Sequence, residues 1–191
     1  MQGTLQITGE AAADRLLNSD GTALLIGMLL DQQVPMEWAF RAPYTLSERL
    51  GHLDAARIAG MSEEAFVSVC CEKPAIHRFP AAMGRRIHAL CGLLADDFAG
   101  DGANVWRDAS SGAALLKTLR TLPGFGEEKS MIFVALLAKR HGIRPPGWEE
   151  AAGPFGDPAP RSAADVDGEE SLARVREWKR ARKQAGKGKQ D

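Results

Sequence analysis

The apolar residues of this chain recur mainly at three- and four-residue intervals, the spacing of one face of a helix. Leu115, Leu119 and Leu122 follow this spacing, and apolar residues at 132, 133, 136 and 137 repeat it further along. No Asn-Gly or Asp-Gly turn lies between two runs of β-branched residues, which would be the usual mark of a β-hairpin. We therefore expect an all-α fold.

The predicted helices share an apolar stripe bounded by turn residues, and one of them begins at a plausible N-cap, Ser62. They cover residues 10–17, 24–31, 35–46, 53–58, 62–70 and 83–98, a helical pair over 112–141, and 169–185. Loops are expected at 72–79 and 99–111, and five prolines predict an irregular path over 144–161. We expect one domain over residues 1–168 and a basic C-terminal helix and tail over 169–191.

Composition describes an ordinary globular chain, and charge adds one detail. The 191 residues are 45% hydrophobic, 26% charged and carry a formal net charge of −1, so they are long enough to bury one substantial core. Residues 172–190 hold eight lysines and arginines against a single acid, Glu177. Two interpretations stay open for this tail: an arm that binds phosphates, or a solvated helix end.

Several classes of protein are disfavoured. The longest apolar run, residues 23–30, is too short to cross a bilayer, and no secretory signal begins the sequence. Cys70, Cys71 and Cys91 form no Cys-x-x-Cys pair, and the four histidines lie far apart. We therefore expect a cytoplasmic protein, with no membrane partner, no disulfide framework and no metal site.

The most informative stretch is a tight turn between the two helices of the predicted pair. It contains Leu122, Pro123, Gly124, Phe125 and Gly126, followed by Glu127, Glu128 and Lys129. Glycines allow the backbone to approach a partner closely, and the helix that follows directs its free N–H groups and positive dipole end out of the turn. Such an arrangement suits a phosphate.

Three motifs in order resemble the helix-hairpin-helix–GPD superfamily of DNA glycosylases, which includes endonuclease III and the alkyladenine glycosylases. The first is the turn just described. The second is residues 24–34, an apolar helix ending in Gln32, Gln33 and Val34, in which Asp31 replaces a small residue of relatives. The third is residues 79–87, similar to the start of the family's long helix. No cysteine follows Cys91, so the iron–sulfur cluster of many relatives is not expected.

The resemblance implies a two-lobed helical fold that binds double-stranded DNA containing a damaged base. The backbone of the turn would grip a phosphate, with K⁺ or Na⁺ as an alkali cation at Gly124 and Gly126. Gln32 and Gln33 would lie at the lesion, and the target nucleotide would be flipped into a pocket between the lobes. We expect a monomer associated with the nucleoid.

The chain departs from the family at the catalytic positions. The lysine nucleophile of some relatives corresponds to Glu128, and Lys129 follows on another face of the helix, so Schiff-base lyase chemistry is not expected. Where relatives carry an aspartate, the chain has Pro146 and Gly147. The nearest candidate carboxylates are Glu149 and Glu150, with Asp157 more distant.

These observations lead to one main hypothesis and two alternatives. The main hypothesis is a monofunctional DNA N-glycosylase, in which Glu150 or Glu149 stabilises an oxocarbenium-like state and Glu128 lies nearby. One alternative is a non-catalytic module that binds distorted or abasic DNA, and another is a helical protein that has lost DNA binding. Ordinary structural roles also remain open: Gln32 and Gln33 as a helix cap, and the four glutamates as acids that open helices.

Overall fold

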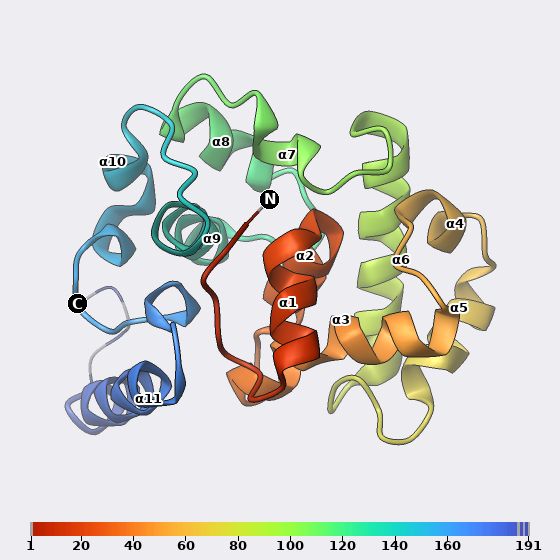
Figure 1. The fold of residues 1–191 in the computed structure, drawn as a ribbon, viewed down its shortest axis with the longest axis horizontal. Helices are drawn as coiled ribbons and strands as arrows, with labels where there is room; N and C mark the ends of the chain where they lie inside the picture. Colours follow the sequence, from red (N-terminus) through yellow and green to blue (C-terminus); the bar gives the residue numbers. More distant parts are fainter. Residues whose placement is uncertain (1, 187, 189, 191) are drawn as a thin grey trace.

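The computed structural model describes residues 2–186, 188 and 190, and over these residues it contains helices and turns without a β-strand. The predicted all-α class is confirmed (Figure 1). Two lysines of the basic tail, Lys187 and Lys189, lie outside the described residues. None of the described helices is both long enough and apolar enough to span a membrane.

The helices follow one another with short connections. They are α1 (Ala11–Ser19), α2 (Gly21–Leu30), α3 (Met36–Leu50), α4 (Ala55–Ala59), α5 (Glu63–Cys71), α6 (Pro80–Asp97), α7 (Asn104–Arg107), α8 (Gly112–Leu119), α9 (Glu127–Arg140), α10 (Trp148–Ala152) and α11 (Glu169–Gln184), with 3₁₀ turns η1 (Gly153–Gly156) and η2 (Ala163–Asp165).

Helix starts follow local chemistry. Ser62 is the N-cap of α5, as predicted, and its side chain accepts a hydrogen bond from Ala65 N. Asp20 caps α2 in the same way through Ala23 N, at 2.9 Å. The long helix α6 begins at Pro80, three residues before the predicted start at Met83. Proline is tolerated in a first helical turn because its missing N–H has no intrahelical partner there.

Two regions expected to be irregular contain short helices, so those expectations were wrong in detail. The predicted loop over 99–111 includes α7, whose Val105 and Trp106 are buried in the core. The irregular stretch over 144–161 includes α10 and η1, where Phe155 is buried. In both places burial of apolar side chains outweighs a local sequence rich in glycine, aspartate or proline.

The packing places the helices in two neighbouring groups that share one continuous core. Helices α4, α5 and α6 pack together on one side, and α8, α10 and η2 surround α9 on the other (Figure 1). Helix α2 lies between them, packs mainly on α3, and has all ten residues buried. The finer expectation, a two-lobed glycosylase-like arrangement, stays a prediction.

The basic helix α11 is attached to the body of the protein. Leu172 and Val175 belong to the hydrophobic core, and Arg176 forms an ion pair with Glu37 of α3. The part of α11 that contains Leu172 and Val175 is therefore packed against the protein, and its cationic residues belong to a fixed helix.

Candidate functional site

Side chains from different parts of the sequence meet at the C-terminal end of α2. Because α2 is buried throughout, its last carbonyl groups need hydrogen-bond donors from within the protein. Leu29 O accepts a hydrogen bond from Lys129 Nζ at 2.6 Å and another from Gln32 Nε2 at 2.9 Å. A cation is favoured at this position because the C-terminal end of a helix carries partial negative charge.

The turn over residues 122–126 lies against the same end of α2. Its apolar side chains point inward: Leu122 and Phe125 are buried, and Phe125 packs edge-on against Phe133 with ring centroids 5.7 Å apart. Phe125 N donates to Leu122 O at 3.1 Å, which closes the turn. The exposed part is therefore the glycine backbone, so Leu122 and Phe125 would support an interface from behind.

Gly124 and Gly126 make different demands on the turn. Gly124 has φ +81°, a left-handed conformation, and a Cβ there would lie 3.5 Å from Leu29 Cγ and 3.9 Å from Arg86 Cδ. Gly126 is extended, with φ −76° and ψ −179°, and is the N-cap of α9 without a side-chain cap. Both glycines are exposed, so the turn presents backbone where a helix begins, which is the chemistry that anions favour.

Two adjacent glutamines leave α2 in different ways. Gln32 is half-buried and acts partly as a helix cap through Leu29 O, while its Oε1 lies 3.5 Å from an Arg86 guanidinium nitrogen. Gln33 is exposed and has φ +57°, a conformation that is uncommon outside glycine. Surrounding structure must stabilise a residue in such a conformation, and residues of this kind are concentrated at functional sites. We refer to residues 31–35 as the Gln turn.

His77 supports the Gln turn from behind. Phe79 N donates to His77 Nδ1 at 3.1 Å, so Nδ1 must be unprotonated and the proton of the neutral ring is on Nε2. Nε2 lies 2.9 Å from Gln32 O and therefore donates to it. This fixed tautomer links the Gln turn to the segment that precedes α6.

Two large aromatic side chains lie exposed beside this link. Trp38 is 39% exposed and Phe79 is 43% exposed, and their rings lie 6.4 Å and 6.1 Å from that of His77. The Arg78 guanidinium lies 4.7 Å from the centre of the Phe79 ring. Exposed aromatic rings with nearby cations are suited to stacking on nucleobases.

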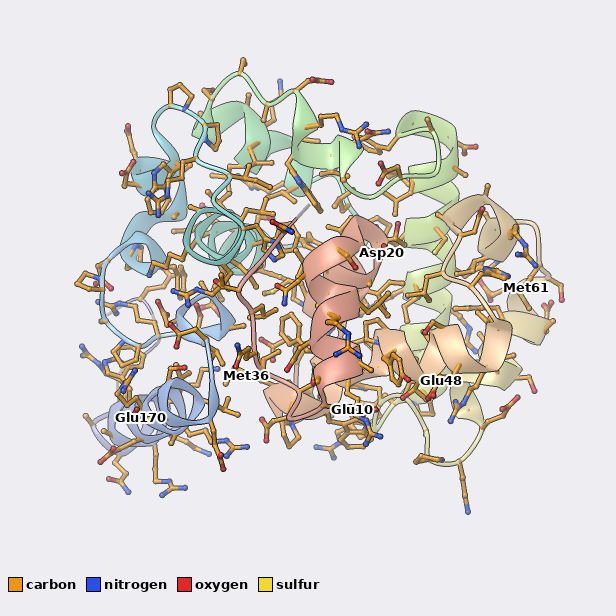
Figure 2. The ribbon with its side chains drawn as sticks, viewed as in Figure 1. Glu10, Asp20, Met36, Glu48, Met61 and Glu170 are labelled. Carbon is orange, nitrogen blue, oxygen red and sulfur yellow. The ribbon has the colours of Figure 1, made fainter. Side chains whose placement is uncertain are left out.

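Helix α11 borders the Gln turn on another side. A groove of about 260 Å³ is lined by Asp31, Gln32 and Gln33 together with Arg176 and Lys179 of α11. Lys179 Nζ lies 3.3 Å from the sulfur of Met36, which Figure 2 labels beside α11. The basic C-terminal helix and the Gln turn, recognised separately in the sequence, thus share a groove.

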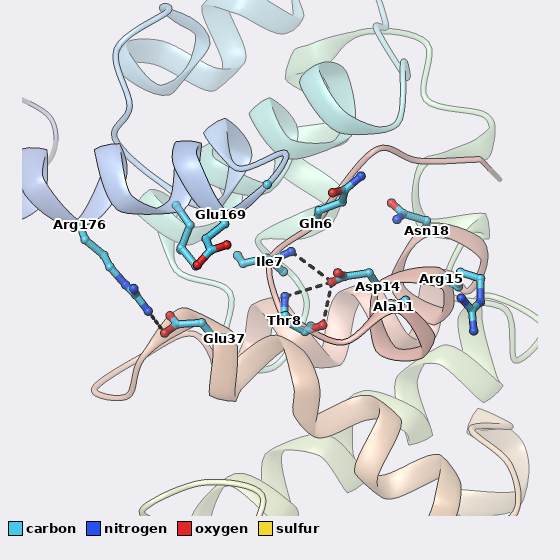
Figure 3. Close-up of a pocket in the computed structure, with 13 residues that line it drawn as sticks. Gln6, Ile7, Thr8, Ala11, Asp14, Arg15, Asn18, Glu37, Glu169 and Arg176 are labelled. Atoms are coloured by element: carbon cyan, nitrogen blue, oxygen red, sulfur yellow. Dashed lines mark hydrogen bonds and ion pairs between the residues drawn. The ribbon is translucent and has the colours of Figure 1, made fainter.

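A larger cavity of about 740 Å³ lies behind the Glu37–Arg176 ion pair (Figure 3). Its central carboxylate, Asp14, accepts hydrogen bonds from Ile7 N, Thr8 N and Thr8 Oγ1 at 2.9–3.1 Å. These bonds hold the N-terminal segment against α1. The Asp14 carboxylate is therefore engaged by the fold.

The predicted carboxylates lie on two helices. Glu128 is half-buried in the first turn of α9, beside Lys129 and directly after the exposed turn. Glu149 and Glu150 are exposed on α10, which packs on α8, α9 and η1. Within the described part of the chain, no hydrogen bond or ion pair joins either of them to the Gln turn or to residues 122–126.

Asp157, the more distant candidate, has a structural role. It forms an ion pair with Arg161 at 2.8 Å, and hydrogen bonding from that guanidinium lowers the pKa of the Asp157 carboxyl. The Arg161 guanidinium in turn lies 5.0 Å from the centre of the Trp178 ring. These contacts fasten the segment before α11.

Metal ligation finds little support among side chains. In residues 2–186, 188 and 190, no three His, Cys, Asp or Glu side chains gather closely enough to hold a metal ion. Burial raises the pKa of the Cys70 and Cys91 thiols to about 12, so neither supplies a thiolate at neutral pH. The Gly126 carbonyl accepts a hydrogen bond from Ser130 N at 3.0 Å, and the alkali cation expected at Gly124 and Gly126 stays a prediction.

Sequence reasoning missed Trp38, His77 and Phe79. No periodicity separates an exposed tryptophan from a buried one, and His77 acquires its role only because Gln32, 45 residues away, folds back against it. The nearest usable signal was Phe79 immediately before Pro80, at the start of the third motif.

No protein-family model, curated protein or solved structure matches this chain. The likeness to the glycosylases therefore rests on three sequence motifs.

Proposed function

We propose that this protein is a base-excision DNA repair protein that binds duplex DNA at a damaged base. One observation carries the proposal: the three motifs of the family resemblance, separate in the sequence, meet at the end of α2. Lys129 and Gln32 share Leu29 O, Arg86 approaches Gln32, and Gly124 packs on Leu29. We call the exposed surface formed by the Gln turn, Arg86, Gly124 and Gly126 the Gln-turn face.

In this proposal the two parts of the face do different work. The glycine backbone and the N-terminal end of α9 bind a phosphate, with an alkali cation at the carbonyls of the turn. Gln33, exposed and held in a left-handed conformation, reaches the lesion. The cations of α11 add attraction for the DNA backbone that depends on salt.

The proposed reaction is hydrolysis of an N-glycosidic bond by a monofunctional DNA N-glycosylase. Lysine attack is disfavoured because Lys129 Nζ is hydrogen-bonded to Leu29 O at the buried end of α2. A carboxylate would stabilise the positive charge that develops on the sugar. Of the three candidates, Glu128 adjoins the Gln-turn face, while Glu149 and Glu150 are exposed on α10.

The second candidate function is a non-catalytic module that recognises distorted or abasic DNA. The exposed position of Glu149 and Glu150 favours it, because these are the only carboxylates near the position of the family aspartate in the sequence apart from Asp157. The two functions share the same binding face and differ in whether a base leaves.

Binding is tested by fluorescence anisotropy at low salt with matched duplexes that are undamaged, abasic or contain one lesion. We expect tighter binding to at least one altered duplex, and loss of that preference in Gln33→Ala. Gln6→Ala, an exposed glutamine of the N-terminal segment, is the matched control. Equal affinity for altered and undamaged duplexes would contradict recognition of damage.

Catalysis is tested on duplexes carrying uracil, 8-oxoguanine, alkylated adenine or an adenine–oxoguanine mispair, each divided into samples with and without alkali. Strand breaks that require alkali support the monofunctional glycosylase. Breaks without alkali would contradict it and return Lys129 to the mechanism. Intact strands with retained preference for damaged DNA favour the non-catalytic module.

A further inference from the structure

A groove lies on α3, the helix that begins directly after the Gln turn. It has a volume of about 340 Å³ and lies between α3 and the segment that precedes α6. Trp38, Arg41 and Thr45 line it from α3, and Lys73, Pro74 and Ala75 line it from the opposite side. Glu48, labelled on α3 in Figure 2, marks the same wall. Its size falls at the lower end of small-molecule sites.

Trp38 lies at this groove with its ring already oriented. The indole N–H donates to Ala75 O at 3.2 Å, while 39% of the residue stays exposed. An exposed ring that is fixed in place loses little conformational entropy when another ring stacks on it.

The groove is connected to the Gln turn through His77. The Trp38 ring centroid lies 6.4 Å from that of His77, and His77 Nε2 donates to Gln32 O. Trp38 also lies three residues beyond the Gln turn in the sequence, so a DNA strand bound at the Gln turn would pass close to Trp38. In this respect the inference rests on the proposed function.

The charge of the groove suits a phosphate. Its lining includes three cations, Arg41, Arg49 and Lys73, and one acid, Glu48. Acids outside the groove pair with both arginines, Glu10 with Arg41 at 2.8 Å and Glu72 with Arg49 at 3.8 Å, so the charge left for a phosphate is that of Lys73. Arg49 is held in place by Val69 O at 2.8 Å and Pro74 O at 2.7 Å, and Lys73 is exposed. Cations that follow a backbone beside an aromatic ring on which a base stacks are the usual means of binding single strands.

We propose that this groove binds one unpaired nucleotide next to the damaged site, with its base stacked on Trp38 and its phosphate near Lys73. A base inside a duplex has neighbours on both faces, so only an unpaired nucleotide exposes a face to the indole. The protein then prefers damage that adjoins unpaired nucleotides, such as a short flap, over the same damage within a continuous duplex.

The experiment compares an abasic duplex with the same duplex carrying a short flap beside the abasic site. The flap contains 2-aminopurine, whose fluorescence falls when it stacks. For the wild type we expect affinity for the flapped DNA to rise roughly 5- to 150-fold, the range given by stacking of one base on an aromatic residue, together with quenching. Trp38→Ala removes both effects and keeps binding to the continuous duplex, and Trp38→Phe retains part of each.

The phosphate is tested separately with Lys73→Glu. This variant should lower the affinity for the flapped DNA and reduce its dependence on salt, while Arg57→Glu, which changes an exposed cation on α4, should not. Circular dichroism confirms that each variant folds.

The outcomes separate this inference from the proposed function. A flap preference and quenching that persist in Trp38→Ala would overturn the groove while leaving the Gln-turn face intact. Loss of all duplex binding, with quenching of a single-stranded oligonucleotide that still needs Trp38, would overturn the proposed function and keep the groove. Absence of quenching with every DNA would remove the groove altogether.

Discussion

The ammonium of Lys129 lies 2.6 Å from Leu29 O and the side-chain amide of Gln32 lies 2.9 Å from the same oxygen. One carbonyl at the end of a buried helix thus receives a donor from two of the motifs that suggested the function. A helix cap was one of the roles left open for Gln32, whereas the contact of Lys129 with Leu29 O was not expected. At the residue scale, the same groups on which the resemblance to the glycosylases rests also complete the hydrogen bonding of α2.

The two glycines of the turn allow fold and binding to be separated. Gly124→Ala places a side chain at φ +81°, which should lower the free energy of unfolding by about 1 kcal/mol. Gly126→Ala adds neither strain nor a clash, because its backbone is extended and nothing lies within 4 Å of an added Cβ, and its cost is that of a poorer N-cap, about 0.5 kcal/mol. If backbone approach to DNA requires both glycines, both variants lose affinity while the first loses more stability.

Urea denaturation and anisotropy with an abasic duplex measure the two effects. Gly51→Ala is the control, because Gly51, the C-cap of α3, has φ +74° in an open position and is outside the proposed binding face. It measures the effect of backbone strain alone. Unchanged DNA affinity in Gly126→Ala would contradict close approach of the backbone at that point.

His141 predicts a dependence of stability on pH. It is buried at the end of α9, and no hydrogen-bond partner is found for either ring nitrogen among the described residues. Burial, with lesser contributions from the N-terminal amine and Arg140, lowers its pKa from 6.5 to about 4. The unfolded chain therefore takes up a proton at a higher pH than the folded protein.

Because of this difference in pKa, the folded protein loses stability as the pH falls. The contribution of His141 is complete above pH 6.5 and is lost as pH falls toward 4, at ~1.4 kcal/mol per pH unit and ~3 kcal/mol in total at most. Urea denaturation between these pH values should show this slope in the wild type and a smaller one in His141→Leu. His52→Leu, at a half-buried position before α4, is the control. Equal slopes in wild type and His141→Leu would contradict the assignment.

At the element scale, α11 changes the meaning of the basic tail. Because Leu172 and Val175 are buried, deletion of the helix would remove core packing as well as charge. Substitution of its exposed cations is the cleaner test. Arg180→Gln with Lys183→Gln should leave stability nearly unchanged and weaken binding to all duplex sequences alike.

The measurement is the salt dependence of binding to an undamaged duplex. If both cations neutralise phosphates, the slope of log K against log salt should become less steep by roughly 2. Substitution of Arg57, an exposed cation on α4, by Gln gives the reference for a charge outside the proposed interface. A slope identical to that of the wild type would assign these cations of α11 to solvated surface.

The sequence could predict the elements that depend on local residues, and it could not predict those that depend on packing against distant segments. The helical class and the N-cap at Ser62 followed from spacing and local chemistry. Helix α7 could not be predicted, because it is formed by burial against a distant segment: Trp106 packs on Phe133. For α10 the sequence offered only Glu149 and Glu150 as acids that could open a helix, and the packing of Trp148 beside Gly112 depends on tertiary structure. The Gln turn and the glycine turn could be recognised as motifs, while their meeting at Leu29 O depends on tertiary packing.

At the scale of the whole molecule, the Gln-turn face joins residues about one hundred positions apart in the sequence. Which carboxylate could act in catalysis depends on which one can approach a nucleotide bound at this face. Any carboxylate that stabilises a sugar cation must lie beside the nucleotide held at the Gln-turn face. Glu128 adjoins the exposed turn, whereas Glu149 and Glu150 are exposed on α10. We therefore expect Glu149→Gln and Glu150→Gln to change neither the affinity for an abasic duplex nor the rate of base release.

Glu128→Gln should behave differently in the same assays. Where the wild type releases a base, single-turnover kinetics of Glu128→Gln should show a rate lower by roughly 10²-fold or more, the scale of losing one electrostatic stabiliser of a transition state. Glu127→Gln, an exposed acid in the same first turn, separates this effect from the general charge of the α9 terminus. A large loss of rate in Glu149→Gln or Glu150→Gln would contradict this assignment. Among the described residues, neither carboxylate forms an ion pair or hydrogen bond with the Gln-turn face. Such a loss would therefore assign the catalytic carboxylate to α10.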